Sequence, residues 1–222
     1  MSNLLERIAK CVEFGKINKT TPFPPDMKDQ EGADELTEKA IAEGVLAIDI
    51  MDKALMPAME RVGNKFSENK IFVPQMLISA KAMNAAMEHL KPFFQSGEVE
   101  KKGTFIIGTV TGDLHDIGKN LAAMMIEGGG WDVIDLGTDV KPVQFLEKVK
   151  ENPGSTVGLS ALLTTTMVNM EGIVKELKEY DPSIKVLIGG APITEDFKNK
   201  IDADFYAQDP QKAVNYLKSL VA

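Results

Sequence analysis

Apolar residues recur every three or four positions between residues 4 and 90, the spacing of helices that bury one face. Pro74 suits the first turn of the last helix in this region, whereas Pro57 lies inside an apolar stripe, where we expect a kink or a break. The pattern predicts four helices in residues 1–92. Their apolar stripes are Leu4, Leu5, Ile8 and Val12; Leu36, Ala40 and Ile41; Ile48, Met51, Leu55, Met59 and Val62; and Val73, Met76, Leu77, Ala80, Met83, Met87 and Leu90.

Residues 93–102 are predicted to form a linker, because Pro92, Gly97 and a cluster of lysines and glutamates interrupt the helical pattern. From residue 103 onward, short β-rich runs alternate with helical segments. This alternation predicts an α/β domain in residues 103–222, with a doubly wound, five-stranded parallel sheet. The predicted strands are Thr104–Val110, Trp131–Leu136, Thr156–Leu162, Lys185–Gly189 and Ala203–Ala207.

Composition excludes several classes of protein. The net charge of -8, with no basic run to offset it, disfavours nucleic acid as a partner. No run of 18 uncharged apolar residues is present, and residues 1–10 lack the long apolar core of a signal peptide, so we expect a cytoplasmic protein that does not span a membrane. Cys11 is the only cysteine, which rules out an intrachain disulfide and a thiolate metal cluster.

The segment from Gly112 to Asn120, Gly-Asp-Leu-His-Asp-Ile-Gly-Lys-Asn, carries the clearest chemical signal. It follows the first predicted strand, so Asp113, His115 and Gly118 should lie at the carboxyl edge of the sheet, where open α/β sheets bind ligands. A histidine between two acids suits metal ligation, since a carboxylate fixes the tautomer of the ring and raises its basicity.

Two phosphate-binding motifs do not fit this segment. A P-loop needs four residues between its glycine and its Gly-Lys pair and then Ser or Thr, but five residues separate Gly112 from Gly118, and Asn120 follows the lysine. The Gly-x-Gly-x-x-Gly fingerprint of dinucleotide-binding domains is also absent from this turn.

The chain resembles a family of cobalamin-binding proteins in three ordered motifs: Asp-x-His-x-x-Gly from Asp113, Ser160-Ala161-Leu162, and Gly189-Gly190. In that family the cofactor is bound base-off, with a protein histidine on cobalt. The helical half is similar to the four-helix cap of cobalamin-dependent methionine synthase. As a whole, the chain resembles the corrinoid proteins of anaerobic methyltransferase systems, which implies a flavodoxin-like or Rossmann-like sheet domain preceded by a helical cap.

The resemblance implies a role for each matching residue. His115 would be the lower axial ligand of cobalt, Asp113 would hydrogen-bond its other ring nitrogen, and Thr166 stands where methionine synthase has a serine that completes this relay. Phe205 departs from the family, whose members often have glycine there, and this puts a contact with the cofactor tail in doubt. The residues expected to bind the cofactor are Gly112, Asp113, Leu114, His115, Asp116, Ile117, Gly118, Ser160, Leu162, Thr164, Gly189, Gly190 and Pro210.

The same resemblance places three residues of the helical half on the methyl-bearing face of the corrin. Phe66 matches the phenylalanine that shields a cobalt-bound methyl group, Val73 stands for a leucine of methionine synthase, and Asp52 stands for a glutamate. An apolar lid would exclude water and oxidants from a reactive centre. The other interpretation is that Phe66 simply packs between helices.

The function implied is that of a methyl carrier without turnover of its own. A substrate-specific methyltransferase would load the corrinoid, an acceptor methyltransferase would pass the methyl group to tetrahydrofolate or a thiol, and a reductive activation protein would restore oxidised cofactor. The linker is a plausible hinge for cap movement. The sequence does not name the methyl donor, for which methanol, methylamines, betaine and aryl methyl ethers are all candidates.

Two other functions share parts of this architecture. Cobalamin-based sensors add a DNA-binding domain and use a cap tryptophan, but the only tryptophan here is Trp131, in the sheet half. The small subunit of an adenosylcobalamin-dependent mutase shares the cofactor domain, and the methyl-shielding type of cap argues against it.

Overall fold

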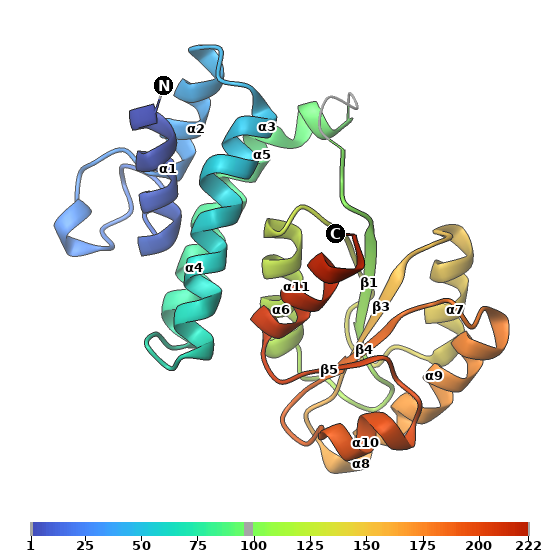
Figure 1. Ribbon diagram of the computed structural model, residues 1–222. Helices are drawn as coiled ribbons and strands as arrows, with labels where there is room; N and C mark the ends of the chain where they lie inside the picture. Colours follow the sequence, from blue (N-terminus) through green and yellow to red (C-terminus); the bar gives the residue numbers. More distant parts are fainter. Residues whose placement is uncertain (1, 96–99, 222) are drawn as a thin grey trace. The chain divides into compact units, whose positions relative to one another are not determined.

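The computed structural model describes residues 2–95 and 100–221, and the chain divides into two compact units (Figure 1). One unit consists of Met1–Lys101 with Gly128–Gly130, and the other of Lys102–Glu127 with Trp131–Ala222. The predicted linker falls partly on residues 96–99, which lie outside the described residues. Its first three residues, 93–95, belong instead to the last helix of the helical unit, which continues through Pro92.

The helical unit contains the four predicted helical segments. They are α1 (Ser2–Phe14), α2 (Ala33–Ala42), the run formed by α3 (Ala47–Ile50), η2 (Met51–Leu55) and α4 (Met56–Ser67), and α5 (Val73–Gln95); a short 3₁₀ turn, η1 (Pro25–Met27), precedes α2. Helix α1 contacts α2, α4 and α5, and most residues of the apolar stripes are buried or half-buried, with Ile48 exposed. The N-terminal helical domain predicted from the sequence is confirmed.

Pro57 neither breaks nor ends the third segment. The five residues before Met56 form a π-helical turn, and Pro57 then occupies the first turn of α4. A π turn widens the helix by one residue and so accommodates a proline that lacks an N–H and crowds the preceding turn. The sequence predicted the position of the irregularity, and the structure shows its form.

The second unit is built on five parallel strands. They are β1 (Thr104–Thr109), β2 (Asp132–Asp135), β3 (Thr156–Ser160), β4 (Val186–Gly189) and β5 (Phe205–Ala207), in the order β2-β1-β3-β4-β5. This is the flavodoxin-like order of a doubly wound sheet. The predicted five-stranded parallel sheet is confirmed.

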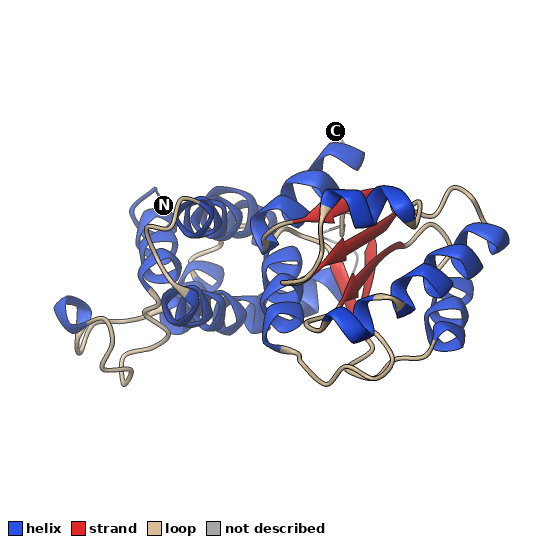
Figure 2. Ribbon diagram, turned by 90° about the horizontal axis from the view of Figure 1, so that it is seen from below, coloured by secondary structure: helices blue, strands red, loops and turns tan. Residues whose placement is uncertain are grey.

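Helices cover both faces of this sheet (Figures 1 and 2). Helices α6 (Ile117–Gly128) and α11 (Pro210–Leu220) lie on one face, while α7 (Pro142–Glu151) and α9 (Asn169–Tyr180) lie on the other. Strand residues alternate between the two faces. Ile106, Leu159 and Ile188 therefore share a core with Phe145 of α7 and Ile173 of α9. The short helices α8 (Thr164–Met167) and α10 (Glu195–Lys200) follow β3 and β4.

Between β1 and β3 the chain reverses the direction in which it adds strands to the sheet, and this position is the topological switch point. The chain leaves β1 for one edge of the sheet and returns at β3 to build the other, so the loops after these two strands diverge at the carboxyl edge, where doubly wound sheets bind their ligands. The loop after β1 contains the Asp-x-His motif, the loop after β3 contains Leu162, and Thr166 lies in the short helix α8 that follows this second loop. The topology therefore brings together two motifs that lie about fifty residues apart in the sequence.

Candidate functional site

Asp113 joins the loops after β1 and β3. Its side chain is 0% exposed, and both carboxylate oxygens are engaged. Oδ1 accepts a hydrogen bond from the backbone N–H of His115 at 3.0 Å and lies 2.8 Å from His115 Nδ1. Oδ2 accepts hydrogen bonds from the Thr166 hydroxyl at 2.6 Å and from the backbone N–H of Leu162 at 2.8 Å. One buried carboxylate thus holds both loops at the switch point.

The hydrogen bonds to Asp113 determine its charge. Burial by itself raises the pKa of the carboxyl, but the hydrogen bonds from Thr166, Leu162 and His115 outweigh it and hold the pKa well below its ordinary value. Asp113 is therefore ionised at neutral pH and can only accept hydrogen bonds. In the contact with His115, Nδ1 is therefore the donor, which leaves Nε2 as the ring nitrogen that can bind a metal.

His115 faces outward from a loop that exposes apolar side chains. The imidazole is 51% exposed, and its neighbours Leu114 and Ile117 are 73% and 66% exposed. Leu162 and Leu163, in the loop after β3, are each 43% exposed. Large apolar groups exposed around one outward imidazole indicate a surface that binds an extended, largely apolar ligand.

The glycines expected to make room for the cofactor differ in their surroundings. A Cβ at Gly118 would meet no atom within 4 Å, so the space beside the first turn of α6 is open. A Cβ at Gly190 would lie 1.8 Å from the carbonyl oxygen of Ala161, and one at Gly189 would lie 3.3 Å from that of Ala207. Gly190 is therefore required by the nearby backbone of Ala161, whether or not a cofactor is bound.

Gly112 and Asp116 shape the two ends of the loop. Gly112 has a φ of 80°, in the region that favours glycine, and its N–H donates to Asp139 Oδ1 at 2.7 Å. Asp116 is exposed, and its Oδ2 accepts from Asn120 Nδ2 at 3.0 Å, within the first turn of α6. Gly112 thus ties one end of the loop to Asp139, 27 residues away, whereas Asp116 holds the other end through a local contact.

The remaining residues expected to bind the cofactor tail lie along the same carboxyl edge. Ser160 ends β3 in register with Gly189 of β4 and is half-buried, while Thr164 is exposed at the start of α8. Pro210 begins α11 and is half-buried. Phe205, the residue that departs from the family pattern, stacks its ring on Tyr216 with centroids 4.3 Å apart. Its ring therefore packs within the sheet unit.

Three predicted residues lie in the helical unit. Phe66 is half-buried near the end of α4, Val73 is half-buried at the start of α5, and Asp52 is exposed in the π-helical turn. Phe66 and Val73 thus flank the connection between α4 and α5.

Sequence reasoning missed the residues that support the motif from below. Thr109, fully buried at the end of β1, donates from its hydroxyl to the carbonyl oxygen of His115 at 2.9 Å. The N–H of Asp139 donates to the carbonyl oxygen of Asp113 at 3.0 Å. The one sequence signal for Thr109 was its position as a polar residue near the end of a mostly apolar predicted strand. Nothing in the local sequence marked Asp139.

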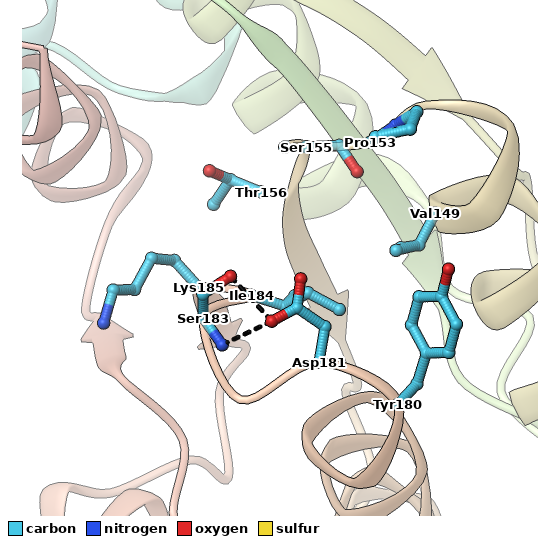
Figure 3. A pocket seen from close by; sticks show the side chains of 10 residues that line it. Val149, Pro153, Ser155, Thr156, Tyr180, Asp181, Ser183, Ile184 and Lys185 are labelled. Carbon is cyan, nitrogen blue, oxygen red and sulfur yellow. Dashed lines mark hydrogen bonds between the residues drawn. The ribbon is translucent and has the colours of Figure 1, made fainter.

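A cavity lies at the opposite, amino edge of the sheet (Figure 3). Thr156 begins β3 and Lys185 directly precedes β4, so this cavity is distant from the loop after β1. Asp181 accepts hydrogen bonds from the backbone N–H of Ser183 at 2.8 Å and from its hydroxyl at 2.7 Å. These groups complete a turn, and we do not assign the functional site to this cavity.

Residues 2–95 and 100–221 contain neither a cluster of metal-ligating side chains nor a membrane-spanning helix. No group of three or more His, Cys, Asp or Glu side chains there could hold a metal ion. In the same residues, no helix is long and apolar enough to cross a membrane.

Comparison with known sequences covers both units. A B12 binding domain model matches residues 103–215, and a second B12 binding domain model matches residues 28–91. The trimethylamine corrinoid protein of Methanosarcina barkeri is 39% identical over 223 residues, which cover 99% of this chain and 98% of the relative. Trimethylamine corrinoid protein 2 of Methanosarcina mazei is 42% identical over 195 residues, covering 86% of this chain and 89% of the relative.

Solved structures agree with the sequence comparison. A cobalamin-binding protein from Desulfitobacterium hafniense superposes with a TM-score of 0.76 at 30% identity, covering 98% of each chain. A chain of the methanol:cobalamin methyltransferase complex from Methanosarcina barkeri superposes with a TM-score of 0.80 at 30% identity, covering 99% of this chain and 80% of that chain. With two B12 binding domains and relatives that match it over nearly its whole length, this chain belongs to the cobalamin-binding corrinoid proteins of methyltransferase systems.

Proposed function

We propose that this corrinoid protein binds cobalamin base-off through His115 and carries a methyl group between two methyltransferases. The observation that supports the binding mode is the hydrogen-bonded chain Thr166–Asp113–His115, which leaves His115 Nε2 free at the sheet's switch point. When bound, the corrin supplies a cobalt centre that can accept and release a methyl group.

The residues at this edge suit such a cofactor. A single outward imidazole can enter one axial position, and the exposed apolar side chains of Leu114, Ile117 and Leu162 can cover the adjoining face of a large ring. Asp113 keeps the proton on Nδ1 and strengthens the imidazole as a ligand, and Thr166 holds Asp113 in place. The chain's own contribution is to orient the ligand, tune its basicity and exclude water.

The displaced nucleotide tail would lie along the carboxyl edge of the sheet. Open space beside Gly118 supports this path, as do the positions of Ser160 and Gly189 at the ends of adjacent strands. Leu162, Thr164, Gly112, Asp116, Gly190 and Pro210 complete the proposed set of cofactor-contacting residues. Phe66, Val73 and Asp52 belong to the proposed cap, and the part of the predicted linker that follows α5 serves as the hinge between the two domains.

The names of the relatives suggest the partners. Two relatives are named trimethylamine corrinoid proteins, and a similar chain belongs to a methanol:cobalamin methyltransferase complex. We propose a methylamine- or methanol-specific methyltransferase as the donor enzyme, a second methyltransferase acting on tetrahydrofolate or a thiol as the acceptor enzyme, and a reductive activation protein.

The test of this function is single-turnover methyl transfer. The full chain, loaded with cobalamin and reduced, is incubated with carbon-14-methyl trimethylamine or methanol and the matching methyltransferase. We expect label to remain with the protein in proportion to its bound corrin, and to leave when an acceptor methyltransferase and its thiol are added. A loaded protein that takes up no label from methylamines, methanol, betaine or aryl methyl ethers would contradict the carrier function.

Replacing Phe66 with alanine tests the proposed cap. We expect cofactor affinity to change little, because Phe66 lies outside the proposed axial and tail contacts, and photolysis of the methylated cofactor to become faster, because an apolar shield is lost. Absorption spectroscopy under constant illumination measures the rate. Phe72→Ala, at a residue that is 66% exposed, is the matched control and should leave the rate unchanged. Equal photolysis rates for Phe66→Ala and the unaltered protein would mean that Phe66 only packs between helices.

A further inference from the structure

Lys119 is a buried cation that the proposed function does not use. It lies in the first turn of α6, four residues after His115, and is only 2% exposed. Its Nζ donates to Asn120 Oδ1 at 2.6 Å and forms an ion pair with Asp135 Oδ2. Burial of a lysine is costly unless its charge is paired and hydrogen-bonded, so this position needs a reason.

Asp135 connects the ion pair to the underside of the His115 loop. It ends β2, and its Oδ1 accepts a hydrogen bond from the N–H of Gly137 at 2.8 Å. The carbonyl oxygen of Gly137 accepts from the N–H of Thr109 at 3.0 Å. The Thr109 hydroxyl then donates to the carbonyl oxygen of His115 at 2.9 Å. A continuous series of polar contacts therefore runs from Lys119 to the histidine backbone.

Asn120 provides a second route to the same loop. Its backbone N–H donates to the carbonyl oxygen of Asp116 at 2.7 Å, and its side-chain amide donates to Asp116 Oδ2 at 3.0 Å. Because Lys119 Nζ donates to Asn120 Oδ1, the lysine orients this amide as well. Both routes end on residues directly beside or within the Asp-x-His motif.

We propose that Lys119 and Asp135 form a positioning pair that holds the His115 loop at one height and orientation relative to the sheet. The proposal rests on the proposed function, since the loop needs a defined height only if His115 must meet a metal. The Lys119 ammonium is buried but the Asp135 carboxylate is 37% exposed, and such an ion pair contributes little net stability, so an apolar residue of similar size can often replace the lysine without loss. However, an apolar side chain can pack against β2 in more than one position. The ion pair, in contrast, forms only when α6 lies at one position along β2.

The test compares Lys119→Met with Lys148→Met in the full chain. Lys148 pairs with Glu151 on the surface of α7, away from the motif, and is the matched control. In the cofactor-free Lys119→Met protein we expect amide exchange at His115 and Asn120 to be about tenfold faster, because charge-assisted hydrogen bonds that support the loop are lost. Exchange in β3 and β4 should be unchanged, and Lys148→Met should match the unaltered protein throughout.

Spectra of the loaded protein give a second readout. In the cob(II)alamin form of Lys119→Met we expect a mixture of states with and without histidine nitrogen coupling in the EPR spectrum. Unchanged exchange at His115 and Asn120, or faster exchange spread equally over the sheet, would overturn the positioning role. Asp135→Asn should loosen the same two amides and is the second variant should Lys119→Met fail to fold.

The two readouts also separate this proposal from the proposed function. If the unaltered protein shows no histidine coupling to cobalt, the axial-ligand assignment fails, yet amide exchange in the cofactor-free chain still decides whether Lys119 and Asp135 hold the loop.

Discussion

In the His115→Ala protein, the EPR spectrum of bound cob(II)alamin is expected to lose the nitrogen splitting that a protein imidazole produces. The reason is that His115 Nε2 is the free nitrogen of a ring whose Nδ1 is held by Asp113 at 2.8 Å. A carboxylate that hydrogen-bonds a ligating ring orients that ring but cannot replace it on the metal. We expect affinity for cobalamin to fall at least tenfold as well, measured by titration of the cofactor-free chain, because the proposed bond between His115 and cobalt is removed.

The sequence supplies a complete control for this experiment. It contains two histidines, and the second, His89, lies in α5 with Nε2 2.6 Å from Asp34 Oδ1 of α2. His89→Ala should therefore retain the splitting, and nitrogen-15 labelling of histidine should alter it in the unaltered protein. Splitting that survives in His115→Ala would show that the nitrogen comes from the cofactor's own base, and the axial role of His115 would be wrong.

Gly190→Ala is expected to destabilise the folded chain by about 3–5 kcal/mol. The added Cβ would lie 1.8 Å from the carbonyl oxygen of Ala161, and the φ of 132° is one that side chains rarely adopt. Because the obstacle is backbone, β3 and β4 must separate at their carboxyl ends. Urea unfolding followed by circular dichroism measures the loss.

Gly118→Ala is the matched control for this substitution. A Cβ at Gly118 meets nothing within 4 Å, so the free energy of unfolding should change by no more than about 1 kcal/mol. If the cofactor tail passes beside α6 as proposed, Gly118→Ala should nevertheless weaken cobalamin binding. Equal unfolding midpoints for Gly190→Ala and the unaltered protein would mean that the backbone there can relax and that the glycine is not required by packing.

Periodicity predicted most of the elements because it reports burial of one face. The four apolar stripes correspond to α1, α2, the α3–α4 run and α5, and the five β-rich runs correspond to β1–β5. The differences lie at prolines and at ends. Pro57 is accommodated by a π turn, and α5 continues through Pro92 to Gln95, since neighbouring turns and packing can compensate for one missing N–H.

Local sequence predicted only part of the candidate site. The contact between Asp113 and His115 spans two residues, so the motif itself contains it. The partners of the other carboxylate oxygen, Leu162 and Thr166, lie 49 and 53 residues away. Resemblance to the cobalamin-binding family suggested Thr166, but only the strand order brings its hydroxyl to Asp113.

Local pattern was enough to establish two domains, a parallel sheet and a histidine presented at its carboxyl edge, because hydrophobic spacing and a strand-end motif are properties of short segments. The burial of Lys119, its pairing with Asp135 and the contact that forces glycine at position 190 depended on the folded chain. Each involves groups that are distant in sequence and come into contact only when β1, β2, β3 and β4 pair in the sheet. The spacing of apolar residues along the chain carries no information about such long-range contacts.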